Sequence, residues 1–329
     1  MDNQTAQFLA ALDAKTSARI EREKPLLPYT TLRVGGTADL FFEARNIDEL
    51  AAVSIAAQRS SIPYFLLGGG SNVCISDSGV RGLVIRNLCE ECEIGTAARV
   101  DCGHGFMALF LKSLRESLGG LEFAVGIPGS VGGALVSNAG AYRQNIDAVV
   151  RSLDVVESGI KKTVGPEWME FSYRDTRLRH PHREPATLLS VNLELTPKPR
   201  REILARARDN QRQRIMKQPW NPSAGSFFKN INDHQLAERV PKLPAALRES
   251  GVVPAGLLSE ACGCRGLRIG GAQITRRHGN IFVNRGGATA TDFRNLANTV
   301  RQRVFDRFGV TLEEEVLYVG DWSKETDRA

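Results

Sequence analysis

The sequence contains no uninterrupted run of about 18 apolar residues, the length at which a segment becomes a candidate transmembrane helix. Its N-terminus, MDNQTAQFLAALDAK, carries an early acidic residue and lacks the basic and then apolar order of a signal peptide. Lysine and arginine are spread along the chain and form no basic tract of the kind found in nucleic-acid-binding segments. We therefore expect a cytoplasmic protein with no membrane partner and no nucleic-acid partner.

Several catalytic and metal-binding signatures are also missing. The chain has no Gly-Lys dipeptide, which excludes a P-loop, and no HExxH motif. The segment PGSVG, 128–132, has proline where a nucleophile elbow requires glycine. Cys89-x-x-Cys92 has no second cysteine pair or histidine pair to complete a zinc site. We expect no metal, and we expect the six cysteines to be free, buried thiols.

The composition is that of an ordinary globular protein. The 329 residues are enough for two domains, and 42% of them are hydrophobic and 24% charged. The net charge of +6 suits a small anionic ligand such as a nucleotide. The 31 glycines are clustered, which points to tight backbone contacts at particular places.

The pattern of apolar residues predicts an α+β fold in both halves of the chain. In the first half, short segments rich in β-branched residues predict strands at 39–44, 64–69, 82–87, 152–157 and 188–195. Residues 47–60 predict a helix with Leu50, Val53 and Ala57 on one face. The segment TPKPR, 196–200, is the clearest linker between the halves.

In the second half, two helices and a final strand are predicted. Residues 201–216 form a basic amphipathic pattern, and a second helix runs from Thr291 to Phe308. We expect Thr291 to cap its start and Gly309 to follow its end. Its predicted apolar stripe consists of Phe293, Leu296, Val300, Val304 and Phe308. The chain then enters a predicted strand at 313–320.

Two glycine-rich stretches are candidates for binding phosphate. LLGGGSNV, 66–73, ends an apolar strand, and GIPGSVGGALVSNAGAY, 126–142, is similar in composition. Phosphate oxygens need several backbone N–H groups close together, which a Cβ would obstruct. Each stretch alone is typical of a surface turn, but together they favour a diphosphate ligand. GHGFMA, 103–108, imitates a dinucleotide-binding motif, yet no acidic residue follows at the required spacing, which favours a simple strand-to-helix turn.

The stretch SAGSFFKN, 223–230, places one hydroxyl, Ser226, between a glycine and two phenylalanines. Taken alone, it is typical of a turn serine beside core aromatics. It also suits a polar group that is directed into a reaction site.

These stretches together resemble the UDP-N-acetylenolpyruvoylglucosamine reductase (MurB) family. The matching blocks occur in the family's order, from about residue 28 to 322, which makes the resemblance specific. They are TTLRVGGTADLF (30–41), LLGGGSN, GIPGSVGGALVSNAGAY, KQPWNPSAGSFFKN (217–230), AGLLSEACGCRGLRIGGAQITRRHGNIFVN (255–284) and LEEEV (312–316). Only seven residues, 178–184, separate SYRDTR from PATLL, which resembles the shorter branch of the family that lacks a tyrosine-bearing loop.

The resemblance implies an α+β fold with a flavin domain of the vanillyl-alcohol-oxidase (PCMH) type, made of two α+β subdomains, and a substrate domain. The implied limits are an N-terminal helical segment at 1–27, the FAD-binding domain at 28–197, the C-terminal domain at 200–322 and a tail at 323–329. The implied activity is an NADPH-dependent, FAD-containing reduction of an enolpyruvyl UDP-sugar in peptidoglycan precursor synthesis. We expect a monomer whose partner is this small molecule.

The resemblance also assigns residues. It implies Ser226 as the proton donor, with Arg174 and Glu315 as the other catalytic residues. Lys217, Lys229, Asn230 and Gln273 would bind substrate, and His278 would be structural. The implied FAD-binding residues are Gly68, Gly69, Gly70, Ser71, Asn72, Pro128, Gly129, Ser130, Gly132, Gly133, Asn138 and Gly140.

Some positions depart from the family pattern. Ile231 replaces the proline that usually follows FFKN, and Ser259 replaces an aliphatic residue before Glu260. Two other interpretations therefore stay open. The chain could be a related flavoenzyme that reduces or oxidises another substrate in a specialised pathway, or a nucleotide-binding protein without catalysis.

Overall fold

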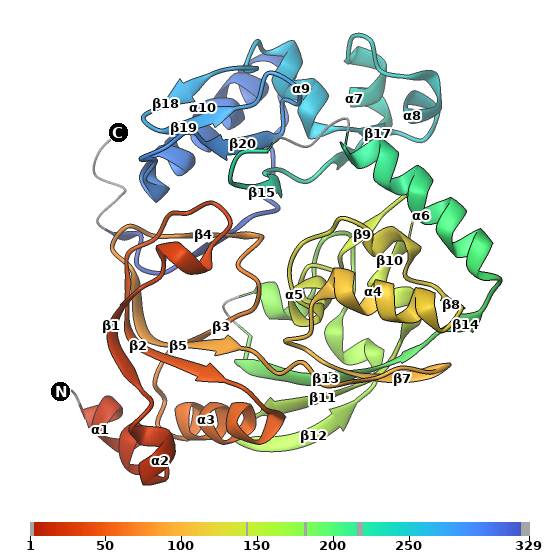
Figure 1. Ribbon diagram of the computed structural model, residues 1–329. Helices are drawn as coiled ribbons and strands as arrows, with labels where there is room; N and C mark the ends of the chain where they lie inside the picture. Colours follow the sequence, from red (N-terminus) through yellow and green to blue (C-terminus); the bar gives the residue numbers. More distant parts are fainter. Residues whose placement is uncertain (1–2, 143, 181–182, 216–219, 324–329) are drawn as a thin grey trace. The chain divides into compact units, whose positions relative to one another are not determined.

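A computed structural model describes residues 3–142, 144–180, 183–215 and 220–323 of the chain (Figure 1). It divides into two compact units, which we describe separately. The first unit comprises residues 1–24, 38–70 and 80–215. The second comprises residues 25–37, 71–79 and 216–329, so it includes two segments from the N-terminal half.

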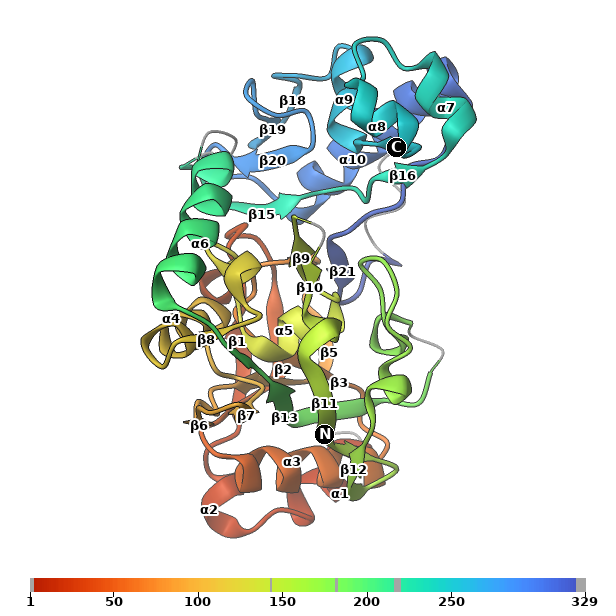
Figure 2. The same cartoon turned by 90° about the vertical axis from the view of Figure 1, so that its right-hand side faces the viewer.

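The first unit contains two main sheets with helices packed on them. Its helices are α1 (Asn3–Ala10), α2 (Ala14–Ser17), α3 (Ile47–Arg59), α4 (Phe106–Arg115), α5 (Val131–Val136) and α6 (Arg200–Ile215). Short 3₁₀ turns are η2 (Glu122–Ala124), η3 (Ile146–Val149), η4 (Pro166–Met169) and η5 (Arg177–Arg179). The long helix α6 lies alongside α4 (Figure 2).

The first sheet has the strand order β1-β2-β5-β3. Its strands are β1 (Glu21–Pro25), β2 (Thr37–Ala44), β3 (Tyr64–Leu67) and β5 (Val80–Asn87). Both β2 and β3 run parallel to β5, with Phe41 and Phe65 flanking Val84 in register. Helix α3 buries Leu50, Val53 and Ala57, as the sequence predicts.

The second sheet has the order β12-β11-β13-β7-β6 and is antiparallel. Its strands are β6 (Cys92–Glu93), β7 (Ala97–Asp101), β11 (Val150–Glu157), β12 (Ile160–Val164) and β13 (Ala186–Glu194). Short pairs are formed by β8 (Leu118–Gly119) with β14 (Thr196–Pro197), and by β9 (Gly140–Ala141) with β10 (Gln144–Asn145).

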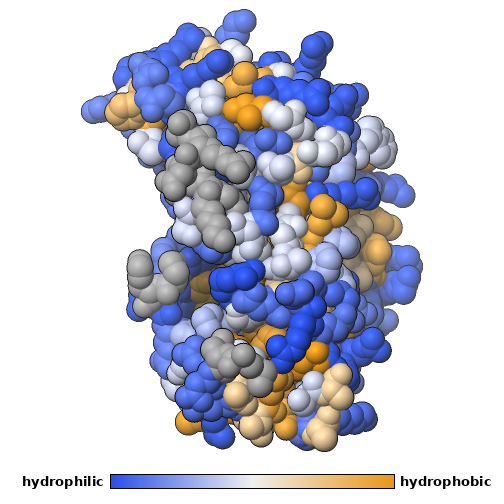
Figure 3. Space-filling model, turned by 90° about the vertical axis from the view of Figure 1, so that its left-hand side faces the viewer, coloured by the Kyte–Doolittle hydropathy of each residue, from blue (hydrophilic) through white to orange (hydrophobic). Residues whose placement is uncertain are grey.

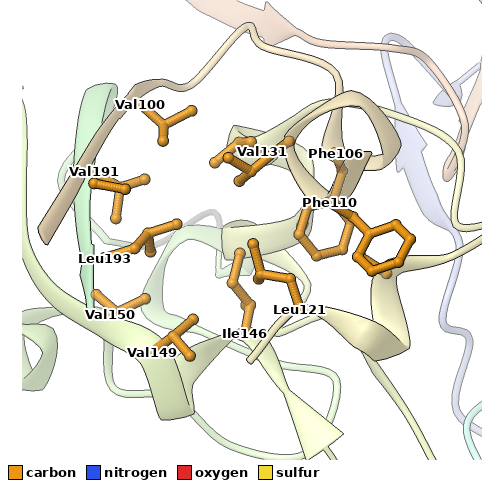
Figure 4. Packing of buried hydrophobic residues seen from close by; sticks show 14 of the residues in the cluster. Val100, Phe106, Phe110, Leu121, Val131, Ile146, Val149, Val150, Val191 and Leu193 are labelled. Carbon is orange, nitrogen blue, oxygen red and sulfur yellow. The ribbon is translucent and has the colours of Figure 1, made fainter. Parts of the chain in front are cut away.

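The central strand β13 contributes to two apolar clusters because a shift in its register with β11 interrupts the alternation of its side chains at Leu189. Leu189 joins α3 and the first sheet, whereas Val191 and Leu193 face the other way. Figure 4 shows Val191 and Leu193 directed towards Phe106 and the other side chains that α4, α5 and the neighbouring turns supply. Helices α4 and α5 thus pack on the apolar cluster that contains Val191 and Leu193.

The second unit is built around one sheet and one long helix. The sheet has the order β15-β20-β19-β18, formed by β15 (Ser223–Ser226), β18 (Arg268–Ile269), β19 (Ala272–Ile274) and β20 (Ile281–Asn284). The other elements are η1 (Leu27–Tyr29), β16 (Ile231–Asn232), β17 (Val252–Val253), α7 (His234–Arg239), α8 (Ala245–Glu249), α9 (Ala255–Ala261) and α10 (Ala290–Phe308). Phe282 and Ile274 pack with the buried stripe of α10, and every residue predicted for that stripe is buried.

The segments from the N-terminal half are firmly tied into this unit. Strand β4 (Val73–Ile75) pairs in parallel with β21 (Leu317–Val319). The Asp77 carboxylate accepts the N–H groups of Ala290 at 2.8 Å and Thr291 at 2.9 Å, at the start of α10. Gly36 donates to the Ser76 carbonyl at 2.8 Å.

The α+β class is confirmed, and three sequence predictions need correction. Helix α10 is capped by Thr289, not Thr291, because Thr289 and Asp292 form a reciprocal capping box while the Thr291 hydroxyl bonds to Asp77. Gly309 does end the helix, with φ of 72°. The strand predicted at 64–69 ends at Leu67, before the glycines. The strand predicted at 313–320 is shortened to β21, because residues 313–315 bond irregularly to residues 227–229.

The surface mixes polar and apolar residues. Figure 3 shows hydrophilic residues over most of one face, with hydrophobic ones between them in separate patches. In the part of the chain that the structure describes, no helix is both long and apolar enough to cross a membrane. All six cysteines are free, but Cys92 and Cys262 are only half-buried, so the prediction of buried thiols is wrong for these two. The described residues contain no cluster of three or more potential metal ligands.

Candidate active site

The two glycine-rich stretches meet in the first unit. Gly68 and Gly69 follow strand β3, and Gly129 and Ser130 precede helix α5. A methyl group at Gly69 would lie 2.7 Å from Gly129 Cα, and one at Gly68 would overlap Ser130 Oγ. Any side chain at Gly68 or Gly69 would therefore force these two turns apart.

At this contact, several backbone N–H donors find no acceptor in the part of the chain that the structure describes. Among the described residues, no acceptor is found for the N–H groups of Gly69, Gly129 and Ser130. The Ser130 hydroxyl caps α5 by accepting the Gly133 N–H at 3.3 Å. Unfilled N–H groups beside residues without side chains are what a diphosphate requires, so this part of the chain fits the diphosphate of FAD.

Other glycines of the second stretch have a packing role. The Gly132 N–H donates to the Cys102 carbonyl at 2.7 Å, and a Cβ at Gly132 would lie 2.9 Å from that oxygen. A Cβ at Gly133 would make only an ordinary contact at 3.6 Å. Glycine is therefore needed at position 132 because α5 packs closely against the end of β7. The motif GHGFMA, 103–108, forms the strand-to-helix turn between β7 and α4, with Gly105 as the N-cap.

Arg174 lies in a tight turn whose flanking residues, Ser172 and Asp175, pair through their backbones. Its own backbone is left-handed, with φ of 55°. Its guanidinium group donates to the carbonyl oxygens of Asn138, at 3.2 Å, and Gly140. The structure thus places Arg174 directly against the second glycine-rich stretch.

Asn138 completes this connection. Its side chain is buried, and its Nδ2 donates to Asp147 Oδ2 at 3.1 Å and to the Ser172 carbonyl at 3.0 Å. A Cβ at Gly140 would collide with the Asn145 side chain, so that position requires glycine. Both amide donors of Asn138 are used within the protein, which gives this residue a role in holding the Arg174 turn.

Ser226 ends strand β15 in the second unit, directly opposite Ile281 of β20. The preceding Gly225 has φ of 78°, a left-handed conformation that favours glycine. Phe227 is 1% exposed, and its ring is stacked on Phe282 with centroids 4.2 Å apart. The serine is therefore held between a special backbone turn and a fully buried aromatic anchor.

Glu315 is joined to the Ser226 turn through the backbone. Its N–H donates to the Phe227 carbonyl at 2.9 Å. On its other side, Asn72 Nδ2 donates to the Glu315 carbonyl at 3.0 Å, and the Leu317 N–H donates to the Asn72 carbonyl at 3.0 Å. The second unit thus brings together Ser226, Glu315 and Asn72, which are far apart in the sequence. Ser71 precedes Asn72, and the division between the units falls between Gly70 and Ser71.

Gln273 shares a face of the sheet with Ser226. Gln273 pairs with Val283 on β20, and Ser226 pairs with Ile281 two residues earlier on the same strand. Side chains two residues apart on a strand point to the same face. Gln273 Nε2 donates to the Gly266 carbonyl at 3.1 Å. The opposite face carries Phe282 and packs on α10.

Two of the remaining predicted substrate residues, Lys229 and Asn230, have protein partners. Lys229 is buried, and its Nζ donates to Glu313 Oε1 at 2.5 Å. Asn230 Oδ1 accepts the N–H of Ala255 at 3.2 Å, the first residue of α9, and so caps that helix. Pro128, which was predicted to bind FAD, is exposed and directly precedes Gly129. Lys217 lies outside the residues that the structure describes.

One polar residue at this site was missed by sequence reasoning. Asn280 is 2% exposed and bonds to the backbone of Phe228, 52 residues away in the sequence. An asparagine after glycine in the segment RRHGN is typical of a turn, and nothing local distinguishes it.

Comparison with known proteins covers nearly the whole chain. Residues 216–319 match the family "UDP-N-acetylenolpyruvoylglucosamine reductase, C-terminal domain", and residues 38–159 match the family "FAD binding domain". The UDP-N-acetylenolpyruvoylglucosamine reductase of Geobacter metallireducens is 36% identical over 319 residues, which cover 96% of this chain and 99% of that protein. The enzyme of the same name from Anoxybacillus flavithermus is 35% identical over 92% of this chain and 94% of its own length.

A solved structure agrees with the sequence matches. The crystal structure of UDP-N-acetylenolpyruvylglucosamine reductase (MurB) from Thermus caldophilus superimposes with a TM-score of 0.73 at 33% identity. The match covers 92% of this chain and 99% of that one. The two family domains, the reductases that match almost end to end, and this fold lead to one conclusion: the chain belongs to the UDP-N-acetylenolpyruvoylglucosamine reductase family.

Proposed function

We propose that this chain is an NADPH-dependent, FAD-containing reductase that converts UDP-N-acetylglucosamine enolpyruvate to UDP-N-acetylmuramate in peptidoglycan precursor synthesis. The supporting observation is that Ser226 and Glu315 are fixed to either side of one residue, Phe227, in a chain that matches such reductases almost end to end. When bound, FAD supplies hydride transfer from NADPH to the enolpyruvyl double bond.

The chain's own residues would manage the charge and the proton. Addition of hydride to one carbon leaves negative charge on the neighbouring carbon and on the substrate carboxylate, and this charge needs fixed donors. Ser226 donates its hydroxyl proton to the carbanionic carbon, forming the new C–H bond, and is reprotonated from solvent. Arg174 suits the carboxylate because its guanidinium group is permanently charged and presents several N–H donors in one plane. Glu315 completes the catalytic set.

The glycine contact would hold the FAD diphosphate. We assign this role first to Gly68, Gly69, Gly129 and Ser130, on the evidence of the Cβ contacts and the unfilled N–H groups. The other predicted cofactor residues would line or support that site. Gln273, on the same sheet face as Ser226, would contact the substrate, as would Lys229, Asn230 and Lys217.

The wider assignment follows the family. We propose an FAD-binding domain at 28–197, a substrate domain at 200–322, an N-terminal segment at 1–27 and a tail at 323–329. The protein would act in the cytoplasm as a monomer. Its partner would be the UDP-sugar, without nucleic acid or membrane.

Purified protein tests the proposal directly. We expect a yellow protein that releases FAD on denaturation. NADPH oxidation should depend on the addition of UDP-N-acetylglucosamine enolpyruvate. A colourless protein that cannot be loaded with FAD would contradict the flavoenzyme assignment. A yellow protein that oxidises NADPH only with some other unsaturated substrate would support the assignment as a flavin-dependent reductase and contradict the assignment of its substrate.

A further inference from the structure

Asn280 forms a two-point clamp on the backbone that follows Ser226. Its Oδ1 accepts the Phe228 N–H at 2.9 Å, and its Nδ2 donates to the Phe228 carbonyl at 2.8 Å. These two bonds engage both the oxygen and the nitrogen of the amide and imitate the exchange between paired strands. Asn280 and Phe228 are both at most 2% exposed, so water cannot replace either bond.

The Asn280 backbone extends the clamp to the next residue. Its carbonyl accepts the Phe227 N–H at 2.8 Å, while the Phe227 carbonyl accepts the Glu315 N–H at 2.9 Å. Residues 227–228 are therefore held from two sides, by Asn280 and by the segment that carries Glu315. A shift of this backbone would move Ser226 relative to Glu315.

Asn280 belongs to a loop, residues 275–280, that is held by hydrogen bonds of its own. The Asn280 N–H donates to His278 Nδ1 at 3.1 Å, and the His278 N–H donates to Thr275 Oγ1 at 3.0 Å. The Gly279 N–H donates to Glu260 Oε1 at 3.0 Å. This arrangement agrees with the structural role predicted for His278, since its Nδ1 acts as an acceptor.

Within the described residues, the side chain of Ser226 is positioned only through the backbone around it. Among the described residues, its hydroxyl makes no hydrogen bond. On its N-terminal side, a Cβ added at Gly225 would meet no atom of the described residues within 4 Å. The orientation of the hydroxyl is therefore set by pairing with Ile281 and by the clamped residues 227–228.

We propose that Asn280 is a positioning residue that aims the Ser226 hydroxyl at the carbon to be protonated. The inference rests on the proposed function, in which Ser226 is the proton donor. It concerns the step in which reduced flavin is reoxidised by the UDP-sugar, and it predicts no role in the reduction of flavin by NADPH.

Asn280→Asp is the informative variant. As a carboxylate it still accepts the Phe228 N–H, but its second oxygen repels the Phe228 carbonyl. Burial and this repulsion raise the pKa of the new carboxyl, and the protonated form can donate to that carbonyl and restore both bonds. We expect reoxidation to be slowed about tenfold or more near pH 8.5, and to recover relative to the unmodified enzyme as the pH falls.

Two titratable groups bond to the loop of Asn280: His278, and Glu260, which is paired with Arg265. The segment that pairs with Phe228 carries Glu314, paired with Arg301, and Glu313, paired with Lys229. Protonation of His278 would remove the acceptor for the Asn280 N–H, which acts against recovery at low pH. These groups are also present in the unmodified enzyme, so dividing the variant's rate by that of the unmodified enzyme at each pH removes the effect of their titration. The reduction of flavin by NADPH should stay within about twofold, because Ser226 takes no part in it.

Asn284→Asp is the matched control. Asn284 ends strand β20, which begins directly after Asn280, and is 7% exposed. Its Nδ2 donates to the Leu32 carbonyl at 2.9 Å and its Oδ1 accepts the Gly286 N–H at 2.8 Å, so it clamps a different part of the backbone. Amide hydrogen exchange in residues 223–230 should rise in the Asn280 variant and not in this control, a measurement that needs neither cofactor nor substrate.

The double variant Ser226→Ala/Asn280→Asp separates the two claims. If Asn280 acts through Ser226, the second change adds little to the first. Full additivity, equal slowing of both half-reactions, or a pH profile without recovery would overturn the positioning role. If Ser226→Ala alone leaves reoxidation unchanged, the proton-donor assignment fails, whereas faster amide exchange would still show that Asn280 clamps this backbone.

Discussion

Replacing Gly69 by alanine tests whether the glycine contact binds FAD. The new methyl group would lie 2.7 Å from Gly129 Cα and 3.3 Å from the Gly129 carbonyl carbon. Ordinary carbon contacts are about 3.5–4.0 Å, so the two turns must separate by about 1 Å. Such a shift takes a hydrogen bond to the diphosphate out of range. Loss of one bond to a charged group costs about 1.5–3 kcal/mol, which weakens FAD binding roughly ten- to a hundredfold.

The assay is titration of apoprotein with FAD, followed by flavin fluorescence. Gly95→Ala is the control, because a Cβ at Gly95 would meet its nearest neighbour, the Ala97 carbonyl oxygen, at 3.6 Å. Its FAD affinity should equal that of the unmodified protein. If the Gly69 variant also binds FAD normally while its melting temperature is unchanged, the two turns do not form the diphosphate site.

Three further changes address stability. Phe227→Ala removes a ring that is 1% exposed, and should lower the free energy of unfolding by about 3–5 kcal/mol in urea titrations; a loss below about 1 kcal/mol would contradict its role as the anchor. Asp77→Ala removes the acceptor for the first N–H groups of α10 and should cost about 1–2 kcal/mol, whereas no change would show that water replaces it. For Glu157, burial raises the pKa, but the hydrogen bond from Lys162 and the charge of Arg177 outweigh it, so the net pKa is below 4.5. Its contribution is complete above that value and is lost as the pH falls through the lowered pKa. Glu157→Gln should therefore reduce stability at neutral pH and flatten the loss below about pH 4.5; identical pH curves would refute this.

Much of the fold could be predicted because its signals are local. The helix at 291–308 has an apolar stripe with the period of a helix and a glycine at its end, and both features determine the observed α10. The N-cap was placed wrongly at Thr291, although Asp292 lies three residues after Thr289 and completes a capping box with it. The tertiary contact with Asp77, more than 200 residues away, could not be predicted, and it engages the Thr291 hydroxyl.

The part of the candidate site that could be predicted from sequence is the part formed by glycines, because clustered glycines indicate exposed backbone N–H groups. The glycine-rich stretches suggested one shared ligand, and the structure shows that Gly69 and Gly129 touch. The family resemblance supplied Ser226 and Glu315, which no local pattern distinguishes from a turn serine and a solvated acid. Asn280 could not be found, because its partner, Phe228, is fixed only by tertiary pairing.

The central claim is that Ser226 donates the proton after hydride transfer, and transient kinetics test it most directly. Enzyme reduced with NADPH is mixed anaerobically with UDP-N-acetylglucosamine enolpyruvate, and the return of flavin absorbance is followed. We predict that Ser226→Ala is reduced by NADPH at the normal rate but is reoxidised slower by about 100-fold or more. Reoxidation of this variant at a near-normal rate would contradict the account.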